Sequence, residues 1–169
     1  QLTAGGDTVL FCVNDRGCSH LYSVGVAGGE PRLVLGGEAR IVKALSVSGS
    51  GPALVISDAT SYRAIVPLHP HTGFELVPTS HGETLAAVEL YPREERQFRS
   101  SDGVTVTGWV IRDPAASGPR PLLLDIHGGP HNSWNPAADE THLYHQELVS
   151  RGWAILLINP RGSDGYGAE

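Results

Sequence analysis

Several residue types are scarce or absent in this chain of 169 residues. It contains no methionine, and its only lysine is Lys43. A chain without methionine does not begin at a retained translation start, so we expect it to be an interior part of a longer protein. No apolar run approaches the ~20 residues that cross a bilayer, and the N-terminus lacks the basic start and apolar core of a signal peptide. These absences predict a soluble, cytoplasmic protein with no membrane partner.

Positive charge is also scarce. Lysine and arginine together number 12, against 18 aspartates and glutamates, and the formal net charge is −6. The basic residues are scattered along the chain, whereas binding to a phosphate backbone requires a basic stripe or patch. We therefore exclude nucleic acid as a partner.

Only two cysteines occur, Cys12 and Cys18. They flank the sequence NDRG at 14–17, which is typical of a hairpin turn between two short apolar runs. In the expected hairpin Val13 lies opposite Cys18, so the two sulfur atoms are out of register. We expect two unpaired thiols in a reducing compartment, not a disulfide or half of a zinc site.

Glycine and proline, by contrast, are abundant, with 21 and 12 copies. Over residues 1–92 they separate short runs rich in valine, leucine and isoleucine, as turns separate strands. Eight such runs make about two four-stranded propeller blades, too few to close a propeller, while a small β-sandwich is the alternative that periodicity leaves open. The predicted strands are at residues 9–13, 20–24, 32–35, 41–47, 53–57, 64–67, 74–76 and 85–90.

The spacing of the strands changes near residues 91–96, where the charged sequence YPREER occurs. A hairpin is expected next, from strands at 97–100 and 104–112, and then a surface loop at 113–121. This change predicts a domain boundary after residue 92.

The rest of the chain predicts a strand, a loop, a helix and a strand in that order, which is one βαβ unit. The strand at 122–126 is apolar at consecutive positions, which is typical of a strand buried on both faces. A helix is predicted over 138–151, with Gly152 at its C-cap, and a second buried strand is predicted from residue 154 to the glycine-rich turn at 159–167. The modest apolar face of the helix is expected from Leu143, Tyr144 and Leu148.

A glycine pair follows the first of these strands, in the sequence HGGPH at 127–131. Glycines can present bare backbone amides, and in acyl-transfer enzymes of the α/β-hydrolase type a His-Gly-Gly loop after the third strand supplies one oxyanion-hole N–H. A glycine pair can also simply turn the chain. The functional interpretation is favoured because a second glycine-rich turn, NPRGSDGYG at 159–167, follows the next strand.

Three short sequences carry a family resemblance: HGGPH at 127–131, RGW at 151–153 and NPRGSDGYG at 159–167. In this order they resemble the start of the catalytic domain of the prolyl oligopeptidase family of serine peptidases, in its acylaminoacyl-peptidase-like branch. A weaker resemblance covers the rest of the chain. The sequences DTVLF, HLYSV and GGEPRLV look like propeller strands and turns, and SDG at 101–103 looks like the crossing into the hydrolase domain.

The resemblance implies a mixed fold in two parts. Residues 1–92 would form about two C-terminal blades of a β-propeller, and residues 93–169 would form the N-terminal part of an α/β-hydrolase domain. It also implies that the amide of Gly129 donates to the oxyanion, that Gly128 lets the backbone approach, and that His127 shapes the loop. His127 is not the catalytic base, because in α/β-hydrolases the base follows the nucleophile along the chain.

The catalytic nucleophile is not expected within these residues. No serine has the Gly-x-Ser-x-Gly elbow, and Ser163 lacks that pattern. The resemblance places the elbow, and the aspartate and histidine that follow it, beyond the turn at 159–167. We therefore expect this chain by itself to have no hydrolytic activity. Arg161 could hold neighbouring loops through its guanidinium group or could face the substrate, and the structural role is favoured.

Cofactor and metal sites are not predicted. The glycines at 162–167 follow the order Gly-x-x-Gly-x-Gly, the reverse of the dinucleotide fingerprint, and no Gly-Lys-Ser/Thr occurs. The histidine pairs that could begin a metal site lack a third ligand. These pairs are His69 with His71 and His142 with His145.

The function implied by the resemblance is hydrolysis of short or N-acylated peptides by a serine peptidase, either an exopeptidase or an oligopeptidase. The propeller would exclude folded chains from the active site. An α/β-hydrolase esterase and a catalytically inactive propeller–hydrolase interaction protein are the alternatives. Open sheet edges in two partial domains predict association of the isolated chain, and a homo-oligomer of the whole protein is left open.

Overall fold

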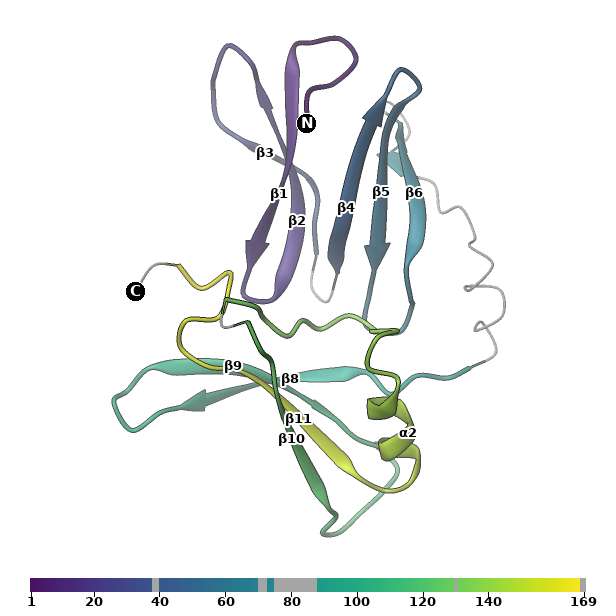
Figure 1. The fold of residues 1–169 in the computed structure, drawn as a ribbon, viewed down its shortest axis with the longest axis vertical. Helices are drawn as coiled ribbons and strands as arrows, with labels where there is room; N and C mark the ends of the chain where they lie inside the picture. The colour runs from purple at the N-terminus through teal and green to yellow at the C-terminus, as the bar shows by residue number, and fades with distance from the viewer. Residues whose placement is uncertain (38–39, 70–72, 75–87, 130, 168–169) are drawn as a thin grey trace.

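The computed structural model describes residues 1–37, 40–69, 73–74, 88–129 and 131–167. These residues form two sheets, one above the other in Figure 1, and residues 131–143 run between them. The first sheet contains β1 (Thr8–Asp15), β2 (Cys18–Gly25), β3 (Arg32–Leu35), β4 (Ile41–Ser48), β5 (Gly51–Ser57), β6 (Ala64–His69) and β7 (Gly73–Phe74). The second contains β8 (Arg93–Arg99), β9 (Thr105–Ile111), β10 (Leu122–Ile126) and β11 (Ala154–Asn159), with helix α2 (Tyr144–Ser150) packed beside it.

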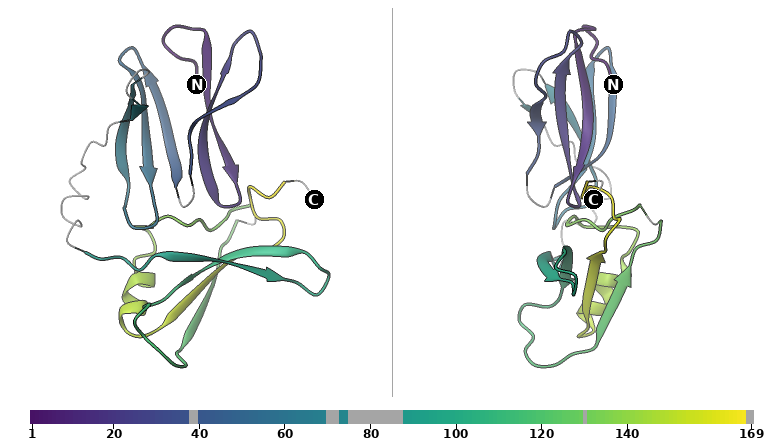
Figure 2. Two further views of the ribbon diagram at one scale, coloured as in Figure 1. Left: turned by 180° about the vertical axis from the view of Figure 1, so that it is seen from behind. Right: turned by 90° about the vertical axis from the view of Figure 1, so that its left-hand side faces the viewer.

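The first sheet consists of two antiparallel groups of strands. β1, β2 and β3 form one group, and β4, β5, β6 and β7 form the other. A single parallel bridge between Ser19 and Ile41 joins them. Seen from the side in Figure 2, the first sheet is a narrow layer above the second. The described strands of residues 1–92, β1 to β7, form one open sheet, so the alternative of two facing sheets in a β-sandwich does not fit them.

Six of the strands predicted for this region are confirmed, at 9–13, 20–24, 32–35, 41–47, 53–57 and 64–67. The strand predicted at 74–76 begins in β7, and its other residues lie outside the described part of the chain. The strand predicted at 85–90 is wrong for its described residues, 88–90, which have no strand structure.

One apolar core serves both groups of strands. It contains Leu21, Leu54 and Val66, whose side chains are at most 1% exposed, together with Leu10, Leu35, Val42 and Ile56. These residues come from the six strands β1 to β6, so burial of apolar area stabilises the two groups as one unit.

The turn between β1 and β2 is tighter than predicted. Arg16 and Gly17 have φ values of 47° and 83°, the two positive values that a two-residue type I′ turn requires. Asp15 therefore lies opposite Cys18, and Val13 lies opposite His20, so the predicted pairing of Val13 with Cys18 is wrong. Leu21 lies opposite Cys12, and the register does not bring the two sulfur atoms together.

The second sheet has the order β10-β11-β9-β8. β10 and β11 are parallel, and α2 lies between them in the chain, which confirms the predicted βαβ unit. The predicted hairpin is also present, but its first strand begins at Arg93 and not at residue 97. Residues 93–96 of the charged sequence taken for a break lie in β8, because an edge strand tolerates charged side chains.

The burial predicted for β10 is wrong. Leu122, Leu124 and Ile126 are 57%, 49% and 61% exposed, because β10 is the edge strand and no described residue covers that face. β11 lies inside the sheet and is buried as predicted, with Ile155 and Leu157 at 0% exposure. The run of apolar residues in β10 therefore does not indicate a strand that is buried on both faces.

Helix α2 is shorter than the predicted span of 138–151. The Asp139 carboxylate accepts hydrogen bonds from the Thr141 N–H (2.9 Å) and from Nδ1 of His142 (2.6 Å), and such local bonds compete with helix formation. The helix ends at Ser150, and Arg151 is its C-cap residue. Gly152 follows with φ of 88° and donates to the Val149 carbonyl, so it lies one position beyond the C-cap instead of at the C-cap as predicted.

The predicted apolar face of α2 is only partly correct. Leu148 packs against the core, but Leu143 and Tyr144 are 51% and 41% exposed. His145 and Val149 are the buried residues of the helix. No helix in the described ranges is both long and apolar enough to span a membrane.

Candidate functional site

The loop after β10 contains the predicted oxyanion donor, Gly129. Its φ is 139°, and a Cβ atom built on it would lie 3.0 Å from both the N and the Cβ of Asn132. Conformation and space therefore both restrict this position to glycine. Gly128 is exposed and has open space around it, whereas Pro130 lies outside the described residues.

His127 joins this loop to the second glycine-rich turn. Its Nε2 lies 2.9 Å from the Oγ of Ser163, and that hydroxyl donates to the Pro160 carbonyl at 2.7 Å. A hydroxyl has one proton, so Nε2 of His127 is the donor when Ser163 donates to Pro160. This arrangement gives His127 a contact through which it can shape the loop, and that role stays a prediction.

Asn159, at the end of β11, binds the far end of the loop. Its side chain is 2% exposed, its Oδ1 accepts from the Trp134 N–H at 2.7 Å, and its Nδ2 donates to the Trp134 carbonyl at 3.0 Å. Nδ2 also lies 3.0 Å from the hydroxyl of Tyr166. Neither Asn159 nor Trp134 was predicted to have a role in the site. A polar residue that ends a buried strand was the signal available for Asn159.

Arg161 forms an ion pair with Asp102 in the turn between β8 and β9, with Nη2 and Oδ2 2.5 Å apart. Hydrogen bonds from the Ser100 hydroxyl, from the Val104 N–H and from Arg161 lower the pKa of Asp102 to about 2. The pair is exposed, so its contribution to stability is small. It links two neighbouring turns, as expected for a structural arginine, but no further observation tests that role.

A network of polar side chains lies beside the loop and contacts the ring of Trp134. Asp125 accepts from Nε2 of His145 at 2.8 Å and from the hydroxyl of Tyr144. Burial raises the pKa of Asp125, but these hydrogen bonds outweigh burial and lower it. Burial lowers the pKa of His145, whose side chain is 1% exposed, more than Asp125 raises it. The pair is therefore a carboxylate bound to a neutral imidazole.

Among the described residues, no group of three or more histidine, cysteine, aspartate or glutamate side chains is placed to hold a metal ion. The rings of His142 and His145 stack, with centroids 5.5 Å apart, and each binds an aspartate. His71, the partner expected for His69, lies outside the described residues.

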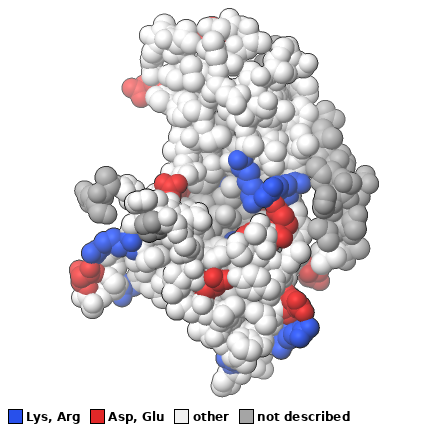
Figure 3. Space-filling view, viewed as in Figure 1, with Lys and Arg blue, Asp and Glu red and all other residues white. Residues whose placement is uncertain are grey.

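A polar pocket opens beside the loop, between the two sheets. Figure 3 shows side chains of both charges gathered around this region of the surface. Lys43 of β4, in the first sheet, forms one wall of the pocket. The end of β10 and the segment that follows it form the opposite wall. The lining residues on that side include Asp125, His127, Gly128, Ser133, Trp134 and His142.

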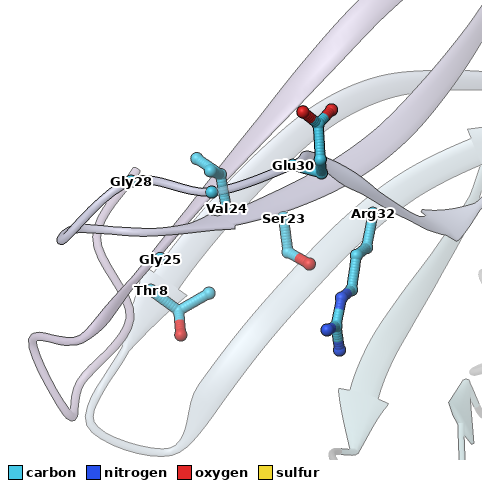
Figure 4. Close-up of a pocket in the computed structure, with 8 residues that line it drawn as sticks. Thr8, Ser23, Val24, Gly25, Gly28, Glu30 and Arg32 are labelled. Carbon is cyan, nitrogen blue, oxygen red and sulfur yellow. The ribbon is translucent and has the colours of Figure 1, made fainter.

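Another pocket lies at the far end of β1, β2 and β3, and Figure 4 shows its lining. Its two charged side chains, Glu30 and Arg32, point in opposite directions. Polar groups that do not converge cannot orient one ligand. The pocket between the sheets is therefore the better candidate.

The first sheet also contacts the second glycine-rich turn directly. Nδ2 of Asn14 donates to the Asp164 carboxylate at 2.7 Å, and the Arg16 N–H donates to the Gly165 carbonyl at 2.9 Å. Two further contacts, the Ala138 N–H to the Asp58 carbonyl at 2.7 Å and the ion pair of Arg63 with Glu140, lie on the other side of the pocket. The two sheets thus meet on both sides of the candidate site.

Comparison with known proteins identifies relatives of this chain. No family model matches it. An uncharacterized peptidase, YuxL, of Bacillus subtilis (strain 168) is 44% identical over 81 residues, which are 45% of this chain and 11% of that protein. The human acylamino-acid-releasing enzyme is 41% identical over 49 residues, which are 29% of this chain and 6% of that protein.

The fold has relatives among solved structures. Acylaminoacyl peptidase from Pyrococcus horikoshii matches 95% of this chain with a TM-score of 0.78 and 22% identity, and the match covers 24% of that protein's chain. At this identity the likeness shows a shared fold. The chain spans about a tenth or less of the length of the two curated relatives. Sequence and fold together support the resemblance of this chain to part of the peptidases of the prolyl oligopeptidase family.

Proposed function

We propose that residues 1–92 are about two blades of a β-propeller and that residues 93–169 are the N-terminal part of an α/β-hydrolase domain. The two antiparallel groups of strands in the first sheet support the first assignment. The parallel pair of β10 and β11, joined through α2, supports the second, because βαβ units build the sheets of α/β domains.

The whole protein is then a serine peptidase that cleaves short or N-acylated peptides by acyl transfer. The observation that carries this proposal is the glycine loop at the carboxyl end of β10, bonded through His127 to the glycine-rich turn after the parallel neighbour β11. Ligands of α/β sheets bind beyond the carboxyl ends of the strands. The peptidase names of the relatives favour a peptide over another ester or amide substrate.

In the proposed reaction, a serine outside this chain attacks the peptide carbonyl with a histidine as base, and the carbonyl oxygen becomes an oxyanion. The Gly129 N–H donates to that oxyanion, beside the N–H that follows the nucleophile. Gly128 keeps side-chain atoms away from the approaching substrate. Loss of one such donor typically lowers kcat about 10²–10³-fold.

Access to the loop is the proposed role of the first sheet. The pocket beside His127 and Gly128 has Lys43 of β4 on its opposite wall, so a substrate there contacts both sheets. Contacts from the turn between β1 and β2 to the turn at Gly165 narrow the approach on one side. Short peptides fit such an approach better than folded chains.

The test uses the complete protein that contains this chain. Intact-mass spectrometry before and after a fluorophosphonate probe reports an activated serine, and paired amide and ester substrates, each with a free or an acetylated N-terminus, report the reaction. One adduct with cleavage of the peptide amides supports the proposal. An adduct with cleavage of esters alone indicates an esterase, and no adduct indicates an inactive interaction protein. The isolated 17.9 kDa chain should remain unlabelled.

A further inference from the structure

Trp134 connects the two ends of the candidate oxyanion loop. It follows the loop in the chain, its side chain is 6% exposed, and its Nε1–H donates to the Asp125 carbonyl at 3.1 Å. Asp125 precedes the loop. One indole hydrogen bond therefore closes the segment that contains Gly129.

Asn159 holds the backbone of the same tryptophan. Its amide group accepts from the Trp134 N–H at 2.7 Å and donates to the Trp134 carbonyl at 3.0 Å, a pairing like that of a neighbouring strand. Trp134 is thus bonded to the end of β10 through its side chain and to the end of β11 through its backbone. All three bonds lie in the buried or partly buried interior, where a lost partner is costly.

The ring of Trp134 is surrounded on several sides. The rings of His142 and His145 make T-shaped contacts with it, with ring centroids 4.9 Å and 5.6 Å away. The Arg93 guanidinium lies over it at 5.9 Å and donates to the carbonyl of Asn135, the next residue, at 2.7 Å. The indole cannot change rotamer without disturbing this packing.

From these contacts we propose that Trp134 and Asn159 are positioning residues for the Gly129 amide, an inference that rests on the proposed function. A glycine at φ 139° has many alternative conformations, and no regular secondary structure holds it. Fixing both ends of the loop reduces the number of conformations open to Gly129 and keeps its N–H in place before the oxyanion forms. Because the oxyanion is absent from the ground state, loss of positioning lowers kcat and leaves KM nearly unchanged.

The first test is Trp134→Phe in the complete protein, which removes the indole N–H and keeps an aromatic ring. A small misplacement of a catalytic group costs on the order of 10²-fold, so kcat should fall about 10- to 100-fold. The matched control is Trp109→Phe. Trp109 belongs to the same apolar cluster and is 1% exposed, but its buried Nε1 has no hydrogen-bond partner among the described residues. The control should lose stability without losing kcat.

The second test is Asn159→Asp, which keeps the acceptor for the Trp134 N–H and removes the donor to its carbonyl. Affinity for a peptidyl boronate, which forms a tetrahedral adduct with the serine, is measured beside KM. Both variants should bind the boronate more weakly by the same factor that lowers kcat. This loss of affinity is not expected from a purely structural role.

The positioning role is overturned if the two variants melt at lower temperature, as Trp109→Phe does, but keep wild-type kcat and boronate affinity. In that case the variants still hydrolyse peptides at the wild-type rate, so the proposed function stands. If Trp134→Phe does not fold, Asn159→Asp decides the question through the same two quantities. A wild-type protein without a fluorophosphonate adduct overturns the proposed function and the positioning role together.

Discussion

Nε2 of His127 and Oγ of Ser163 lie 2.9 Å apart, although 36 positions separate the two residues in the chain. This contact joins the loop after β10 to the turn after β11. Ser163 is 5% exposed, and its hydroxyl also donates to the Pro160 carbonyl within the same turn. The one hydroxyl therefore stabilises the turn and binds His127.

Ser163→Ala should therefore weaken both the turn and the loop. The variant leaves His127 and the Pro160 carbonyl without their common partner, which should lower the free energy of unfolding by about 1–3 kcal/mol. In the complete protein kcat should fall while KM changes little. Chemical denaturation and steady-state kinetics measure the two effects. Ser101→Ala, in the exposed turn between β8 and β9, is the control, and an equal effect of both variants would contradict the prediction.

Gly17→Ala should be strongly destabilising. Gly17 has φ of 83°, and an added Cβ would lie 2.6 Å from Cη2 of Trp109 and 2.8 Å from the Trp134 carbonyl oxygen. Gly6→Ala is a matched control, because Gly6 has φ of 73° but nothing within 4 Å of the added atom. The control should show only the backbone strain, of about 1–2 kcal/mol. Denaturant unfolding of both variants isolates the clash, and similar losses would show that Gly17 is needed only for its φ.

Acidification should destabilise the network around Asp125. Burial lowers the pKa of His145 below its ordinary value of 6.5, so the unfolded chain binds that proton more readily than the folded one. The stability contributed by neutral His145 is complete above 6.5 and is lost as pH falls below it toward the lowered folded-state pKa. Asp125, Arg93 and His142 are the charged or titratable groups acting on His145.

His145→Gln tests this dependence, because glutamine can donate to Asp125 and does not titrate. Melting temperatures measured from about pH 8 to about pH 5 should fall less steeply for the variant than for the wild type. Parallel curves for the two proteins would show that His145 has the same pKa in the folded and unfolded states.

The exposed face of β10 should make the isolated chain self-associate. Leu122, Leu124 and Ile126 are each about half or more exposed on an edge strand, and such edges pair with other chains. Leu124→Lys should raise the monomer fraction measured by light scattering. Val26→Lys is the control, because Val26 follows β2 in the first sheet and is 57% exposed. An equal rise in the monomer fraction for both variants would show that β10 is not the associating surface.

Much of the local structure was predictable. Residues 122–126 form a strand at the predicted limits, and a second strand begins at residue 154 as predicted. The glycine pair after β10 adopts a conformation that excludes side chains at Gly129. The start of α2 was not predictable from periodicity, because the Asp139 side chain bonds the backbone that would have formed its first turn. The family resemblance is supported by the relatives, whereas the role of the glycine loop remains a prediction.

The sequence by itself determined the strands, the turns and the positions of the two glycine-rich segments, because alternation, breakers and glycine's freedom of φ depend on neighbouring residues. Only the tertiary structure decided that β10 is an exposed edge and that His145, not Tyr144, is buried. It alone also brought Asn159 to Trp134 across 25 positions. Sheet order and long-range hydrogen bonds depend on which segments meet in space, and no local pattern specifies that choice.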